Sequence, residues 1–156
     1  MGSMESRTST QHTKIVVAVA LLRRRPGLEA ELFIARRTSP ESVAGMWEFP
    51  GGKLEPGETL HEGLHRELLE ELGVSVVLHE EIVGGGHASF SPESGWWLKE
   101  TTAMRLFRGE LVDGEPFPLQ DHDRVDWVPV TPRLLDYAWI PADRPIVEQI
   151  LRDVSV

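Results

Sequence analysis

Three glutamates and one arginine lie close together in the stretch RELLEELG, residues 66–73. If this stretch is helical, Glu67, Glu70 and Glu71 fall within an arc of about 100° on one flank. Like charges at these spacings repel and cost an isolated helix about 0.2–0.5 kcal/mol per pair. A hard divalent cation would relieve this repulsion, and all-oxygen ligands favour Mg²⁺, Mn²⁺ or Ca²⁺ over zinc. The stretch therefore predicts a metal-binding helix, with a solvated charged face as the simpler alternative.

The helix that must carry these carboxylates has recognisable ends. Thr59 is a good N-cap, and Glu62 three residues later completes a capping box. Gly73 suits the position after the last helical residue, because glycine adopts left-handed backbone angles without strain. The glutamates are therefore expected on the flank of a packed helix. An apolar stripe next to them can face the core, and it consists of Leu64, Leu68 and Leu72.

The rest of the chain mixes strands and helices without regular alternation, which indicates an α+β fold with a mixed sheet. Residues 51 and 52 are both glycine and permit unusual backbone angles between an extended segment and the helix. The connection over residues 84–95 is expected to be flexible. Strands are predicted at residues 14–22, 31–37, 47–49, 75–83, 96–107 and 124–130, the first two as a hairpin, and small helices at 132–137 and 142–154.

Composition limits the classes of function that remain. The 156 residues fit one domain, expected over residues 14–156, and residues 1–13 (MGSMESRTSTQHT) are predicted to be an expression scar with a disordered N-terminus. No apolar run is long enough for a membrane span, and the absence of cysteine fits a reducing cytoplasm. The net charge of −9 argues against a nucleic acid polymer as partner. It does not exclude a nucleotide, because acidic proteins that handle phosphates usually recruit a divalent cation.

Residues on both sides of the charged stretch complete a known pattern. The chain resembles the Nudix family, whose box is G-x5-E-x7-R-E-U-x-E-E-x-G-U with U aliphatic. The segments WEFPGGK (residues 47–53) and IPADRPIVEQIL (residues 140–151) are similar to the MutT-like branch, so the resemblance covers roughly residues 14–154. Every specified position of the box is matched, by Gly52, Glu58, Arg66, Glu67, Leu68, Glu70, Glu71, Gly73 and Val74.

The resemblance implies a mixed β-sheet sandwiched between α-helices and hydrolysis of nucleoside diphosphate derivatives with Mg²⁺ or Mn²⁺. In the MutT-like branch a nucleoside triphosphate becomes a monophosphate and pyrophosphate. Carried over, Arg66 would orient Glu70, and Glu58 would support the loop and helix. One of several carboxylates would deprotonate the attacking water. Predicted metal ligands are Glu67, Glu70 and Glu71, the backbone of Gly51 or Gly52, and Asp121 from a later loop, with Asp123 as second candidate.

Substrate-binding residues are expected in three places. Arg37 ends a predicted strand where similar enzymes direct an arginine at the phosphates, and Lys53 is a weaker phosphate candidate. Asp143 stands where the oxidised-guanine enzymes that resemble this chain have an asparagine. An ionised carboxylate only accepts hydrogen bonds, so it favours a donor-rich base edge such as the amine of cytosine. Asp143 also has a competing interpretation, as the N-cap of the last helix.

The sequence therefore predicts a cytoplasmic, Mg²⁺-dependent nucleoside triphosphate pyrophosphohydrolase. The resemblance is closest to the subgroup acting on CTP, dCTP and 8-oxo-dGTP, which implies a role in cleaning the nucleotide pool. Two alternatives stay open: a Nudix hydrolase of ADP-ribose or another nucleoside diphosphate derivative, and a non-catalytic nucleotide sensor. No membrane partner is expected, and the protein is predicted to be a monomer or a loose homodimer.

Overall fold

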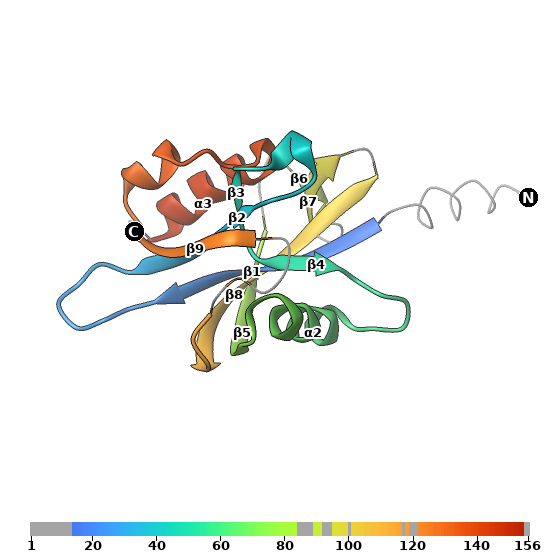
Figure 1. Cartoon of the computed structure of the whole chain (residues 1–156), viewed down its shortest axis with the longest axis horizontal. Helices are drawn as coiled ribbons and strands as arrows, with labels where there is room; N and C mark the ends of the chain where they lie inside the picture. The colour runs from blue at the N-terminus through green and yellow to red at the C-terminus, as the bar shows by residue number, and fades with distance from the viewer. Residues whose placement is uncertain are drawn as a thin grey trace, which may run out of the picture.

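The computed structural model describes residues 14–83, 89–91, 95–99, 101–116, 118 and 122–154. Nine strands in this part of the chain form one mixed sheet, with helix α2 on one face and helix α3 on the other (Figure 1). The strands are β1 (Lys14–Arg23), β2 (Glu31–Arg37), β3 (Trp47–Glu48), β4 (Gly51–Lys53), β5 (Ser75–Ile82), β6 (Ser89–Ser91), β7 (Gly95–Lys99), β8 (Thr102–Asp113) and β9 (His122–Pro129), and the helices are α2 (Leu60–Leu72) and α3 (Arg144–Val154).

Strand β1 lies at the centre of the sheet. It runs parallel to β8 and antiparallel to β2 and β4, and β2 in turn pairs with β3 and β9. The predicted hairpin of β1 and β2 is confirmed, although the two strands pair only near the turn, at Leu22 with Leu32 and Arg23 with Glu31. Beyond that point the strands diverge, so β1 contributes to one half of the sheet and β2 to the other.

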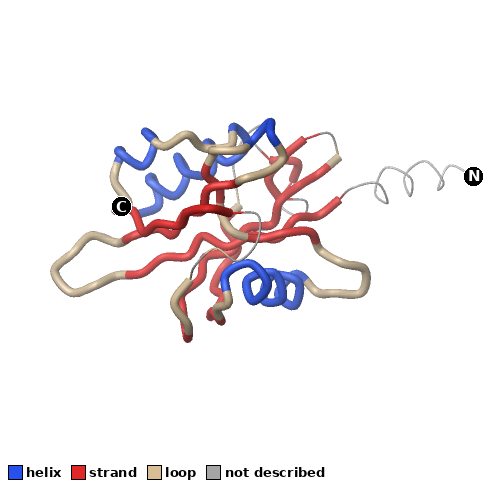
Figure 2. Tube along the Cα trace, viewed as in Figure 1, coloured by secondary structure: helices blue, strands red, loops and turns tan. Residues whose placement is uncertain are grey.

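Both faces of β1 are buried because a helix covers each face of the sheet (Figure 2). Alternate side chains of a strand point to opposite faces. Val17 and Val19 accordingly pack in the cluster with Leu68 of α2, whereas Ala18 and Ala20 pack in the cluster that includes α3. This arrangement explains the continuous apolar run of β1, which is typical of a strand covered on both sides.

The predicted ends of the box helix are confirmed. The Thr59 side chain accepts a hydrogen bond from the Glu62 backbone N–H, the Glu62 carboxylate accepts one from the Thr59 backbone N–H, and Gly73 has left-handed angles with φ of 69°. Gly63 lies inside the helix. A Cβ at Gly63 would lie 2.6 Å from Leu54 Cδ1, so the missing side chain lets the preceding loop pack against the helix.

Three sequence expectations need correction. Residues 96–107 are not one strand but parts of two, β7 and β8, which form an antiparallel hairpin between Lys99 and Thr102. This turn has no glycine or proline to mark it in the sequence. The region expected to be a flexible connection contains the short strand β6. The first of the two predicted last helices is a 3-10 helix, η3 (Pro132–Asp136). The second begins with a 3-10 turn, η4 (Pro141–Asp143), which leads directly into α3.

Trp47 of β3 connects the strand layer to the segment before α3. Its backbone N–H donates to the Ala138 carbonyl at 2.9 Å, and its carbonyl accepts from the Ile140 N–H at 3.0 Å. The segment that leads to η4 is therefore held in register with β3. Within the described residues, no helix is both long and apolar enough to cross a membrane.

Candidate active site

The site is built where β4 approaches β1 and α2 most closely. A Cβ on Gly51 would lie 2.0 Å from the Val17 carbonyl oxygen, and a Cβ on Gly52 would lie 2.2 Å from the Glu67 carboxyl carbon. Neither glycine has a positive φ. The expectation that this pair provides unusual backbone angles is therefore wrong, and the glycines are required by close packing.

Arg66 of α2 binds several carboxylates at once. Its guanidinium donates to Glu58 through Nε at 2.7 Å and through Nη2 at 3.1 Å. Nη1 donates to Glu67 at 3.1 Å and to Glu70 at 3.2 Å, and Nη2 also reaches the Lys53 carbonyl at 3.1 Å. The predicted contact with Glu70 is confirmed, but Glu58 is the main partner. Arg66 therefore joins the loop before α2 to the glutamates on the helix.

The three box glutamates differ in environment. Glu71 is only 6% exposed and accepts a hydrogen bond from the Gly51 N–H at 3.3 Å. Burial, together with the charges of Glu67 and Glu48, raises the pKa of Glu71 to about 7. Burial also raises the pKa of Glu67, against the opposing effect of Arg66. Glu70 is half exposed. Glu67 and Glu71 therefore lie in an environment that disfavours their charged forms unless a cation is bound nearby.

The carboxylates do not by themselves form a complete metal site. Among the described residues, no three acidic or histidine side chains converge closely enough to hold an ion. Asp121 lies outside the described residues, and Asp123 is bound at the surface by Arg36, with two N–O distances of 2.9 Å. The fit to a divalent cation rests instead on the donor chemistry: oxygen ligands, one of them buried with a raised pKa, beside the backbone of Gly51.

A cavity of about 740 Å³ is lined both by glutamates of α2 and by the segment before α3. Glu67 and Glu71, which with the Gly51 backbone are here called the glutamate cradle, come from one element, α2, and Asp143 comes from η4. Lys53 also lines the cavity, and its side chain is exposed. Apolar members of the lining include Val16, Ala18, Phe49, Leu98, Met104, Ile140 and Ala142.

Asp143 is almost completely buried, at 4% exposure. Burial and the nearby charge of Glu48 raise the pKa of Asp143 to about 8, against a hydrogen bond with the Phe49 backbone. Burial therefore favours the neutral form of Asp143, whereas the preference expected from the sequence assumed an ionised carboxylate. A neutral carboxyl group has one O–H donor as well as acceptor oxygens. Asp143 can thus offer a base both a donor and an acceptor.

Sequence reasoning missed Glu48, which lies at the cavity, and His122, which contacts Glu48. Glu48 lines the cavity, and its Oε2 lies 2.9 Å from Arg37 Nη1 and 2.8 Å from His122 Nε2. Arg37, expected to point at phosphates, is therefore engaged with Glu48. The segment WEF could have pointed to Glu48. Its two aromatic neighbours, Trp47 and Phe49, are buried, so a carboxylate between them indicates a polar role rather than core packing.

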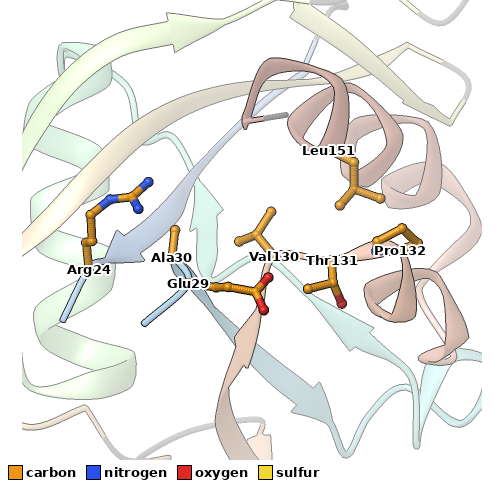
Figure 3. A pocket seen from close by; sticks show the side chains of 7 residues that line it. All are labelled: Arg24, Glu29, Ala30, Val130, Thr131, Pro132 and Leu151. Atoms are coloured by element: carbon orange, nitrogen blue, oxygen red, sulfur yellow. The ribbon is translucent and has the colours of Figure 1, made fainter. Parts of the chain in front are cut away.

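Trp96 and His61 are not part of the lining of this cavity. Trp96 is buried and donates from Nε1 to the Ile82 carbonyl, so it packs within the sheet. His61 packs edge-on against Phe107 at 4.9 Å between ring centroids. A second cavity of about 410 Å³ lies between the β1–β2 turn and the end of α3 (Figure 3). Its lining comprises Arg24, Glu29, Ala30, Val130, Thr131, Pro132 and Leu151, none of them from the glutamate cradle.

Comparison with known proteins agrees with this geometry. Residues 13–150 match the family model described as the NUDIX domain. The chain therefore belongs to the NUDIX family, and the predicted family and fold are confirmed.

Several relatives are similar over almost their whole length. A Mycobacterium tuberculosis protein provisionally named 8-oxo-dGTP diphosphatase 2 is 36% identical over 142 residues, which cover 91% of each chain. The CTP pyrophosphohydrolase of Escherichia coli is 32% identical, over 88% of this chain and 93% of its own. Among solved structures, the E. coli ORF135 protein superposes with a TM-score of 0.64 at 28% identity, covering 91% of this chain and 92% of its own.

We expect Gly52→Ala to weaken metal binding with little effect on folding. The new Cβ would meet the end of the flexible Glu67 side chain, which must move away, rather than rigid backbone. Because Glu67 is a predicted ligand, the apparent Kd for Mn²⁺, measured by electron paramagnetic resonance, should rise about 10- to 100-fold. Gly27→Ala is the control: its φ of 75° strains the β1–β2 turn locally, but its added Cβ has no atom within 4 Å, so Mn²⁺ affinity should not change. Unchanged Mn²⁺ affinity in Gly52→Ala would contradict this role of the glycine.

Asp143→Asn is expected to stabilise the fold increasingly as pH rises. The folded protein holds a proton on Asp143 up to pH about 8, whereas the unfolded chain releases it near the ordinary pKa of 3.8. The folded state binds more protons in this window, so wild-type stability falls with rising pH. The urea midpoint of the variant should exceed that of wild type by more at about pH 8 than at about pH 5. The exposed Asp136→Asn is the control, and an equal gap for both variants would refute the buried, neutral carboxyl.

Proposed function

We propose that this chain is a divalent-metal-dependent nucleoside triphosphate pyrophosphohydrolase that converts an NTP and water into an NMP and pyrophosphate. The observation that carries the proposal is one cavity lined both by Glu67 and Glu71 of α2 and by the buried Asp143 of η4. A nucleoside triphosphate needs both kinds of group, a metal-binding site for its charged phosphates and a hydrogen-bonding partner for its base. The names of the two relatives, an 8-oxo-dGTP diphosphatase and a CTP pyrophosphohydrolase, support this reading.

Mg²⁺, or Mn²⁺ in its place, would be held by Glu67, Glu70 and Glu71, with Asp121 and the backbone of Gly51 or Gly52 as further ligands. When bound, such a cation screens the phosphate charge and makes water more acidic for attack on phosphorus. The protein's own residues supply the rest. Arg66 holds Glu67 and Glu70 in place, and one of the carboxylates at the site would accept a proton from the attacking water.

The phosphates would be met by Lys53, whose side chain is exposed at the cavity edge. Arg37 would act beside Glu48. Its Nη1 donates to Glu48 at 2.9 Å and its Nε to the Ser39 carbonyl at 2.7 Å, which uses two of its five N–H donors. Lys53, with its more exposed side chain, is the stronger phosphate-binding candidate of the two.

The base would be recognised by Asp143 in its neutral form. A carboxyl that donates and accepts can pair with the amine and ring nitrogen of cytosine, and equally with the donor and acceptor edge of an oxidised guanine. This dual capacity favours CTP, dCTP and 8-oxo-dGTP as substrates, and with them a role in nucleotide-pool sanitation. The substrate would be a mononucleotide rather than a polymer, and the enzyme would act in the cytoplasm as a monomer or loose dimer.

A nucleotide panel tests the activity. Wild type with Mg²⁺ is expected to release pyrophosphate from CTP, dCTP or 8-oxo-dGTP. Glu70→Gln should lower kcat/KM by about 100-fold or more, the scale of losing one electrostatic stabiliser of the transition state. Because the Glu70 side chain is half exposed, the Glu70→Gln variant should still fold. The exposed Glu148→Gln on α3 removes the same charge elsewhere and should remain active.

The panel also separates the alternatives. Release of AMP from ADP-ribose without pyrophosphate from any triphosphate would favour the diphosphate-derivative hydrolase. Binding without turnover of any nucleotide would favour a sensor. Full activity of Glu70→Gln would contradict its metal-binding role.

Asp143→Asn tests recognition of the base. The amide keeps a donor and an acceptor but cannot lose a proton, so the variant should hydrolyse one class of base at the expense of the other. We expect the ratio of kcat/KM for CTP to that for 8-oxo-dGTP to change by about tenfold, the scale of one altered hydrogen bond to a base. An unchanged ratio would mean that Asp143 does not contact the base.

A further inference from the structure

His122 has an unusual environment for a polar side chain. Its ring is fully buried, with a side-chain exposure of 0%. Nε2 lies 2.8 Å from Glu48 Oε2, and Nδ1 has no hydrogen-bond partner in the described part of the protein. A buried ring nitrogen without a partner is a cost to folding. The one polar contact that His122 makes is therefore the contact with Glu48.

Glu48 is held from one side only. Arg37 Nη1 lies 2.9 Å from Oε2, the same oxygen that His122 contacts. Over the described residues, the second oxygen, Oε1, has no such bond, and the carboxylate is 14% exposed in the wall of the cavity. Two donors on one oxygen fix the orientation of the carboxylate, so the other oxygen is available as an acceptor.

Glu48 also has a defined position in the cavity lining. Its charge acts on Glu71 in the glutamate cradle and on Asp143 of η4, raising the pKa of both groups. Because Glu48 lines the same cavity as Glu71 and Asp143, its free oxygen would lie within reach of a nucleoside bound there. A fixed acceptor contributes more to transition-state binding than a mobile one, because its orientation is not lost on binding.

We propose that His122 is a positioning residue: with Arg37 it holds Glu48 Oε2 so that Oε1 accepts a hydrogen bond from an O–H or N–H donor of the bound nucleoside. This inference rests on the proposed function, and it adds a residue that acts on the substrate only through another side chain. His122 has no part in holding metal in this proposal.

The test compares two replacements of His122. His122→Leu fills the buried space without a donor, and its kcat/KM for CTP should fall about 10- to 100-fold. His122→Gln places an amide donor near the former Nε2 and should recover most of that loss. Since the ring nitrogen Nδ1 is unpaired, the melting temperature of His122→Leu should stay within about 3 °C of wild type. A large fall in melting temperature together with no rescue by Gln would overturn the positioning role.

A double-mutant cycle with Glu48→Ala shows whether the effect passes through Glu48. In the Glu48→Ala background, His122→Leu should change kcat/KM by less than about twofold, because no carboxylate remains to be positioned. An undiminished loss in that background would overturn the proposal. The control is His79→Leu, which removes another histidine–glutamate pair of 2.8 Å, formed with Glu110 on the outer face, and should leave kcat/KM unchanged.

Two further comparisons keep the outcomes separate. If wild type hydrolyses no nucleoside triphosphate, the proposed function fails; if wild type is active and His122→Leu is equally active, only this inference fails. Comparing CTP with dCTP and UTP identifies the donor. A loss confined to CTP and dCTP indicates the base amine, and a loss larger for CTP than for dCTP indicates the 2′-hydroxyl group. Binding of CMP, titrated with EDTA present, should weaken in His122→Leu as well.

Discussion

The site depends on the contact distance between β4, β1 and α2. At Gly51 and Gly52 there is no room for a β-carbon, because the Val17 carbonyl and the Glu67 carboxyl occupy the positions that it would take. Strand β4 can therefore lie against β1 and bring its backbone to the glutamates of α2. The N–H of Gly51 reaches Glu71 as a result. Backbone groups and helix carboxylates thus meet in one place without any side chain between them.

The cavity carries more negative than positive charge. Glu48, Glu67 and Glu71 line it together with the cations Arg37 and Lys53, while Arg66 lies behind the helix glutamates and binds four carboxylates at 2.7 to 3.6 Å. The raised pKa values of Glu67 and Glu71 reflect this imbalance and their burial. A bound cation would reverse it, because it favours the charged form of both groups. Burial and charge together make the cradle favourable for a cation and unfavourable for a nucleotide arriving alone.

Local features of the chain were predictable. The capping box at Thr59, the left-handed Gly73 and the leucine stripe follow from spacing within one helix, and the box itself identifies the family. Features that depend on distant packing were not. The raised pKa of Asp143 follows from its burial and from the charge of Glu48, more than ninety residues earlier. The contact between His122 and Glu48 spans 74 positions of sequence and leaves no periodic pattern. The β7–β8 turn lacks a glycine or proline, so composition gave no boundary.

The backbone bonds of Trp47 to Ala138 and Ile140 have a consequence for redesign. They hold β3 in register with the segment before α3, so the positions of Glu48 and Asp143 in the cavity lining are linked through the backbone. Leu98 of β7 and Met104 of β8 also line the cavity, and they belong to a separate hairpin. Changes of side-chain volume at these two positions offer a way to widen or narrow the range of accepted nucleotides while leaving the hydrolytic machinery in place.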